Sequence, residues 1–146
     1  MGHHEYNLSR FVTAQDPVYT QVCAELAAGR KESHWMWFIF PQLRGLGSSG
    51  MAQRYALSSL DEARAYLAHP LLGERLRRCT GLVNGVEGRT IQQIFGYPDE
   101  LKFRSSMTLF AHAAAAAGAP EPFVSALAKY FAGEEDPRTR ELLAQE

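Results

Sequence analysis

The stretch Ser33-His34-Trp35-Met36-Trp37-Phe38-Ile39-Phe40-Pro41-Gln42 holds both tryptophans of the chain and two of its eight phenylalanines, next to a histidine. It leads into the glycine-rich segment Gly45-Leu46-Gly47-Ser48-Ser49-Gly50. Large aromatic faces beside a few polar groups are typical both of buried cores and of ligand pockets. We therefore take residues 33–42, the aromatic block, as the expected centre of the fold and the starting point for any site.

The sequence on either side of the aromatic block predicts helices. Asp16-Pro17 indicates a helix start and Gly29 its end, while Ser59-Leu60-Asp61-Glu62 has the spacing of a capping box. Start signals, stop signals and apolar periodicity together predict helices over 17–28, 60–69, 71–84, 100–117, 122–132 and 137–143. Residues 37–40 alone resemble a strand, and because a lone strand has no partner we expect a buried helical or extended segment there.

These elements predict an all-α fold, a compact single-domain multihelical bundle of about seven helices with a central aromatic core. A length of 146 residues fits one domain over 1–146, in which we expect residues 1–6 to be disordered. The net charge of −1 and the scattered basic residues do not favour nucleic-acid binding. Because the sequence contains neither a membrane-length apolar run nor a signal-like N-terminus, a cytoplasmic location is expected.

Metal and cofactor chemistry finds little support in the sequence. His3 and His4 have no acidic or cysteine partner nearby, and the chain has no HExxH, HxH or CxxC pattern. We expect no metal and no cofactor.

The predicted helix over 100–117 begins with Lys102, Ser105 and Ser106 in its first two turns. A lysine, two hydroxyls and the positive end of the helix dipole can together present donors to an anionic ligand group. The alternative is structural, with the stem of Lys102 buried at the edge of the core and its ammonium reaching water.

The other candidates are residues of the aromatic block, Arg44 two positions beyond it, and His69. Trp35 and Trp37 offer stacking faces, Gln42 an amide and Arg44 a positive charge that suits a nucleotide-like ligand. His34 and His69 are the candidate acid or base groups. The alternative is a core of tryptophans with a histidine that is hydrogen-bonded within the protein.

Motifs along nearly the whole chain resemble the family catalogued as domain of unknown function 1810, some of whose members are labelled calpastatin-like. They include Gly29-Arg30-Lys31, the aromatic block, Met51-Ala52-Gln53-Arg54-Tyr55-Ala56, Tyr66-Leu67-Ala68-His69-Pro70, Ile94-Phe95-Gly96 and Lys102-Phe103-Arg104-Ser105-Ser106-Met107-Thr108-Leu109-Phe110. The resemblance implies a mainly helical single domain and supplies no reaction.

Two functions from different classes remain open on the sequence. In the first, the protein binds a small anionic ligand, a nucleotide or a phosphorylated metabolite, in a polar pocket beside the aromatic block. In the second, it is a non-catalytic adaptor that binds a protein partner through an exposed aromatic patch.

Overall fold

The computed structural model describes residues 6–146, which form ten helices and no strand. The helices are α1 (Ser9–Gln15), α2 (Tyr19–Ala27), α3 (Met36–Ile39), α4 (Gly50–Arg54), α5 (Leu60–Ala68), α6 (Leu72–Asn84), α7 (Ile91–Phe95), α8 (Asp99–Ala115), α9 (Phe123–Phe131) and α10 (Pro137–Ala144). The all-α prediction is confirmed, but the expected count of about seven helices is wrong. The count fell short because α3, α4 and α7 have only four or five residues each, too few for an apolar period.

Disorder is expected over residues 1–6, of which residues 1–5, with His3 and His4, lie outside the described residues. Tyr6, the first described residue, is partly buried against the hydrophobic core. Within residues 6–146 no helix combines the length and the apolar character needed to cross a bilayer.

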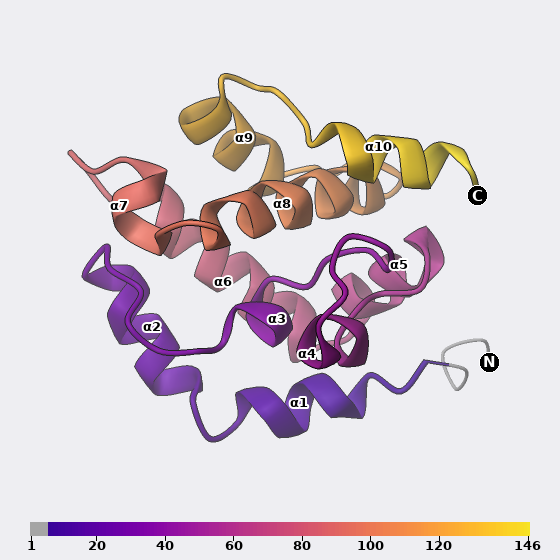
Figure 1. Cartoon of the computed structure of the whole chain (residues 1–146), viewed down its shortest axis with the longest axis horizontal. Helices are drawn as coiled ribbons and strands as arrows, with labels where there is room; N and C mark the ends of the chain where they lie inside the picture. Colours follow the sequence, from indigo (N-terminus) through magenta and orange to yellow (C-terminus); the bar gives the residue numbers. More distant parts are fainter. Residues whose placement is uncertain (1–5) are drawn as a thin grey trace.

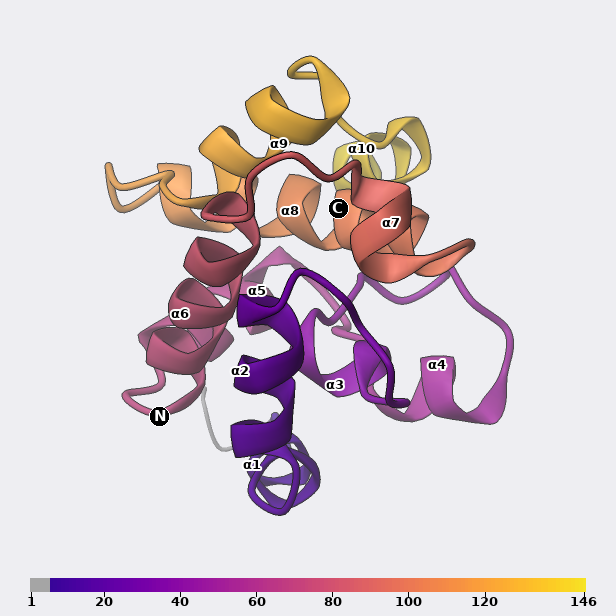
Figure 2. The same cartoon turned by 90° about the vertical axis from the view of Figure 1, so that its left-hand side faces the viewer.

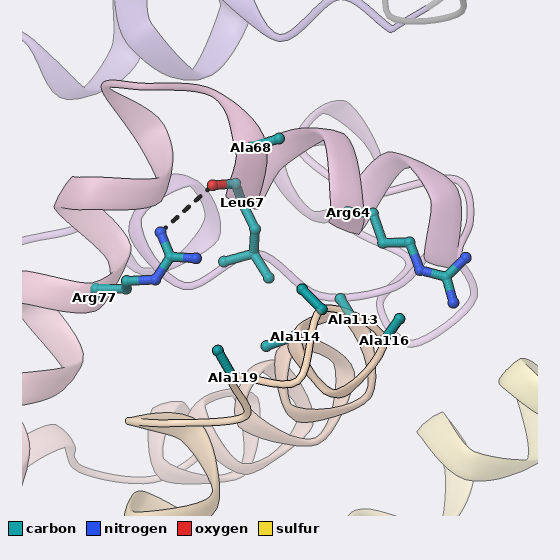
Figure 3. A pocket seen from close by; sticks show the side chains of 9 residues that line it. Arg64, Leu67, Ala68, Arg77, Ala113, Ala114, Ala116 and Ala119 are labelled. Carbon is teal, nitrogen blue, oxygen red and sulfur yellow. Dashed lines mark hydrogen bonds between the residues drawn. The ribbon is translucent and has the colours of Figure 1, made fainter.

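Helix α8 is the central element of the fold. It packs against α5 and α7, and against α9 and α10 (Figure 1, Figure 2). Its alanine-rich C-terminal end, with Ala113 and Ala114, lies across a small hollow from Leu67 of α5 (Figure 3). Contacts on several sides explain why most residues of α8 are buried.

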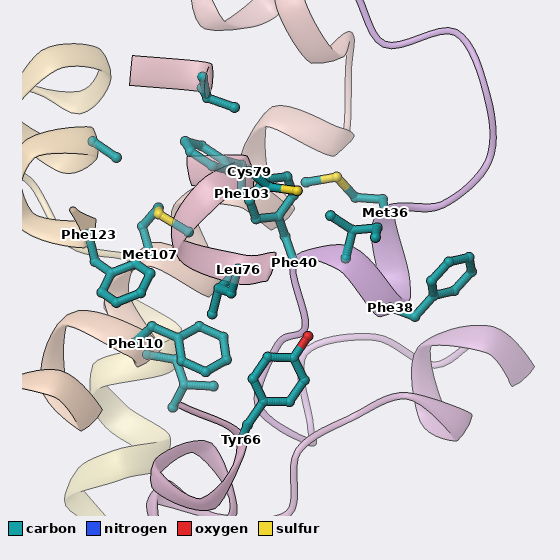
Figure 4. Close-up of a cluster of buried hydrophobic side chains, with 14 of the residues drawn as sticks. Met36, Phe38, Phe40, Tyr66, Leu76, Cys79, Phe103, Met107, Phe110 and Phe123 are labelled. Carbon is teal, nitrogen blue, oxygen red and sulfur yellow. The ribbon is translucent and has the colours of Figure 1, made fainter. Parts of the chain in front are cut away.

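The core is aromatic, and Phe103 of α8 lies in the middle of it (Figure 4). Its ring stacks on Phe95 with centroids 4.9 Å apart and meets Phe40 edge to face at 5.0 Å. Trp35 extends this cluster, with its ring 6.3 Å from Phe40 and 6.5 Å from Phe95. These offset and edge-to-face geometries are the favoured arrangements of aromatic pairs, and they fix the aromatic block to α7 and α8.

The predicted helix boundaries agree with the structure where a cap or a glycine sets them. Ser59 Oγ accepts a hydrogen bond from the Glu62 N–H at 3.1 Å and caps α5, and Gly29 follows α2 with a φ of +72°. The predicted start of α2 is wrong. Asp16 is instead the C-cap of α1, and its carboxylate pairs with Arg75 at 2.9 Å, so α2 begins only after Pro17 and Val18.

Candidate functional site

The two tryptophans of the aromatic block occupy different environments. Trp35 is only 1% exposed, and its indole N–H donates a hydrogen bond to Glu25 Oε1 at 2.9 Å. Trp37, the second residue of α3, is partly exposed. The buried indole belongs to the core, and the half-buried one is free to face a ligand.

Glu25 fixes the segment that enters α3. Its carboxylate accepts the N–H of Glu32 at 2.8 Å, the N–H of Ser33 at 3.0 Å and the Ser33 hydroxyl at 2.5 Å, besides Gln21 and Trp35. Burial by itself raises the pKa of Glu25, but the hydrogen bonds from Ser33, Glu32 and Gln21 outweigh burial and lower the pKa to about 2. Glu25 is therefore a buried anion that anchors the start of the aromatic block.

A cavity of about 480 Å³, which we call the Trp37 cavity, opens beside the exposed face of the aromatic block. Trp37 and Gln42 form one wall, and residues 46–49 of the glycine-rich segment form a second. The start of α8 and the start of α10 form the remaining walls of the cavity. The residues that line these walls are Pro98, Leu101, Lys102, Ser105, Asp136 and Arg138. The volume lies within the range of small-molecule sites.

Lys102 is the main cation of this cavity. Its Nζ lies 5.3 Å from the centroid of the Trp37 ring and 3.3 Å from Asp99 Oδ1. The other carboxylate oxygen of Asp99 pairs with Lys31 at the shorter distance of 2.9 Å, and the Lys31 side chain is more buried than that of Lys102. One carboxylate thus serves two ammonium groups, and Lys102 is the less tightly held of the two.

The N-terminus of α10 reaches the cavity because three bonds tie its approach to α8. Thr108 Oγ1 accepts the Asp136 N–H at 2.9 Å, and the Arg104 guanidinium donates to the carbonyls of Glu134 and Glu135 at 3.0 Å each. The Asp136 carboxylate caps α10 by accepting the Thr139 N–H at 2.8 Å. Its charge is therefore used within the helix cap, next to the cavity.

The structure brings four of the predicted ligand-binding residues to one place, since Trp37, Gln42, Lys102 and Ser105 all line the Trp37 cavity. The Ser105 hydroxyl donates to the Leu101 carbonyl at 3.1 Å, which leaves its lone pairs able to accept. The Gln42 side chain makes no hydrogen bond within residues 6–146.

The other predicted site residues lie elsewhere. Trp35 is in the core, and Ser106 is fully buried with a hydroxyl that has no partner in the described part of the chain. Arg44 lines a separate cleft. His34 is exposed and does not line the Trp37 cavity, and His69 Nδ1 accepts the N–H groups of Leu71 and Leu72 at 3.2 Å each, at the entry to α6.

Sequence reasoning missed Asp136 and Arg138 as cavity residues. Asp136 is recognisable in the sequence as the cap of α10, but only the packing of α10 on α8 brings it to the cavity that Lys102 lines. Among residues 6–146 there is also no group of three or more histidine, cysteine or acidic side chains arranged to hold a metal ion.

The fold and the cavity describe an all-helical protein with a half-open polar pocket beside a buried aromatic core. The chain belongs to the family described as "Protein of unknown function (DUF1810)", which matches residues 5–143. It is similar to a conserved hypothetical protein from Mycobacterium tuberculosis of known crystal structure, with 63% sequence identity and a TM-score of 0.93. The similarity covers 96% of this chain and 98% of that one. No functionally curated protein matches the chain.

Proposed function

We propose that the protein binds a small anionic ligand, a nucleotide or a phosphorylated metabolite, in the Trp37 cavity. The observation that carries the proposal is the convergence of Trp37, Gln42, Lys102 and Ser105, from two distant segments, on one cavity of about 480 Å³. Stacking faces, hydrogen-bonding groups and a cation within one small cavity are the ordinary components of a nucleotide-type site.

Each component has a distinct role in this proposal. Trp37 supplies an apolar face for a planar group, and the Gln42 carboxamide, unpaired within residues 6–146, offers both a donor and an acceptor to its edge. Lys102 supplies the charge for the anionic group, and Arg138, from the start of α10, lines the same cavity as a second cation. Since neither His34 nor His69 lines the cavity, the proposal is one of binding and assigns no catalytic residue.

The alternative is an adaptor that binds a protein partner. It is favoured by the exposure of Tyr97 (82%) and Leu101 (47%), which lie just before and within the first turn of α8. Trp35 and Phe40 are buried and offer no surface to such a partner. An adaptor face would therefore rest on Tyr97, Leu101 and Trp37. The small-ligand proposal gives a role to more of the residues that line the Trp37 cavity than the adaptor proposal does.

A thermal-shift screen against nucleotides, sugar phosphates and other anionic metabolites at constant ionic strength tests the proposal. A ligand present at 100 times its dissociation constant stabilises a folded protein by about 2.7 kcal/mol, which raises Tm by roughly 5–10 °C for a chain of this size. We expect Lys102→Ala to reduce the shift of the best ligand strongly. Arg78→Ala is the matched control, since it removes an exposed cation that lines neither the Trp37 cavity nor the cleft of Arg44.

Two results would overturn the proposal. One is that no compound shifts the wild-type protein. The other is that the shift survives in both Lys102→Ala and Trp37→Leu, because a ligand in the Trp37 cavity cannot be indifferent to both of these walls.

A further inference from the structure

A second cleft, of about 320 Å³, lies between α1, α4 and the start of α5. Among residues 6–146 three arginines line it, Arg10, Arg44 and Arg54, together with one carboxylate, that of Glu62. The segment 42–57 contributes to both hollows, but the residues it places here are not those that line the Trp37 cavity.

Arg10 and Glu62 form a fixed, internally paired floor. Arg10 donates to the carbonyls of Asn7 at 2.6 Å, Arg54 at 2.9 Å and Ala56 at 2.9 Å, and it pairs with Glu62 Oε2 at 3.2 Å. The other Glu62 oxygen accepts the N–H and the hydroxyl of Ser58 at 2.7 and 2.8 Å. The negative charge of Glu62 is therefore matched by Arg10, and most of the donors and acceptors of the two groups are already used within the protein.

Arg44 and Arg54 remain as surplus positive charge. Both are exposed, and neither pairs with a carboxylate within residues 6–146. A single exposed arginine is an ordinary feature of a protein surface. Here, both arginines line one cleft, and neither has a carboxylate partner within residues 6–146. The Arg54 guanidinium carbon lies 5.6 Å from the centroid of the Tyr55 ring, and the backbone of Arg44 is held by its N–H bond to the Leu57 carbonyl at 2.7 Å.

We propose that this cleft binds the phosphate group of a small molecule. Each guanidinium presents a planar fork of N–H donors that matches two oxygens of an oxyanion. A phosphate monoester carries close to two negative charges at neutral pH and three acceptor oxygens, which match the two unpaired guanidinium groups in charge and in donors. A monocarboxylate carries only one charge and one pair of oxygens, so it fits the cleft less well.

The test is a titration of the full chain with inorganic phosphate, in which Tm is measured at each phosphate concentration. Sodium chloride keeps the ionic strength constant. Wild type, the double variant Arg44→Ala/Arg54→Ala, the control Arg78→Ala, and Lys102→Ala as a report on the Trp37 cavity are compared. We expect a saturable shift in the wild type, an apparent dissociation constant at least tenfold higher in the double variant, and no change in Arg78→Ala. Glycerol phosphate and acetate, titrated in parallel, separate a preference for the phosphate group of a metabolite from a general response to anions.

Each of the other outcomes contradicts the binding of phosphate in this cleft. The absence of a saturable phosphate shift in the wild type overturns the proposal, as does an undiminished shift in the double variant. An equal response to acetate overturns the assignment to phosphate. If Lys102→Ala abolishes the shift while the double variant keeps it, phosphate binds in the Trp37 cavity, which refutes this inference and supports the proposed function. Because both arginines are exposed, the double variant should keep the wild-type Tm when phosphate is absent.

Discussion

Replacing Glu25 by glutamine should weaken the anchor at the start of the aromatic block. The carboxylate accepts five hydrogen bonds, and the amide that replaces it can accept through only one oxygen. The pKa of Glu25 is lowered from 4.5 to about 2, and each pKa unit corresponds to about 1.4 kcal/mol, so the charged form contributes on the order of 3 kcal/mol to stability. We expect Glu25→Gln to lower the free energy of unfolding at pH 7 by about this amount.

The pH dependence gives the prediction a sharper form. Because folding lowers the pKa of Glu25, its contribution is complete above the unfolded-state pKa of about 4.5 and is lost as the pH falls from there to about 2. At pH 3 the wild type should already have lost about 2 kcal/mol of this contribution, which the glutamine variant never had. The difference in unfolding free energy between the two proteins should therefore narrow by about 2 kcal/mol between pH 7 and pH 3.

Urea unfolding at both pH values, followed by circular dichroism, measures this difference. Glu87→Gln is the control, because the Glu87 side chain is 90% exposed and should change stability by less than about 0.5 kcal/mol at pH 7. A difference between wild type and Glu25→Gln that is the same at pH 7 and pH 3 would refute the reasoning. So would a loss below about 1 kcal/mol at pH 7.

Three further substitutions test the packing. Gly73→Ala should destabilise the protein by more than about 2 kcal/mol in urea unfolding, because the added Cβ would overlap the Leu67 carbonyl oxygen. Gly81→Ala, on the same helix but with open space around the added Cβ, should instead stabilise it by about 0.5–1 kcal/mol, and a loss of stability there would contradict this explanation. Ser106→Ala should be neutral or stabilising, by up to about 1 kcal/mol, because it removes a buried hydroxyl that has no partner within the described residues. Should Ser106→Ala weaken the ligand-induced thermal shift without lowering stability, the hydroxyl serves a ligand after all.

The parts of the fold that the sequence predicts are those encoded by local chemistry. A serine hydroxyl caps α5 and an aspartate caps α10, and both partners lie three residues away in the sequence. Four apolar residues of α6 recur at helical spacing and are buried as expected, namely Leu72, Leu76, Cys79 and Val83. The short helices α3, α4 and α7 lack such signals, since a single turn is stabilised mainly by what it packs against.

The candidate site shows the same division between local and tertiary information. Lys102 and Ser105 share a helix start, and the sequence reveals this directly. The sequence cannot decide which tryptophan is buried, because that depends on Glu25 in a different helix accepting the indole N–H of Trp35. It also cannot place Asp136 at the cavity that Lys102 lines, because the bond from the Asp136 N–H to Thr108 of α8 is a tertiary contact.

The charges around the Trp37 cavity already have partners inside the protein, and this determines how an anion can bind there. Lys102 shares Asp99 with Lys31, and Arg138 pairs with Glu141 at 3.1 Å. An entering anion must compete with these carboxylates. Its binding free energy therefore reflects only the difference between the cation's existing ion pair and its new ion pair with the ligand. When Lys102 turns toward a ligand, Lys31 still neutralises Asp99, so the exchange leaves no carboxylate unpaired. For this reason we expect binding to depend on Lys102, while Lys31, packed 5.1 Å from the centroid of the buried Trp35 ring, keeps a structural role.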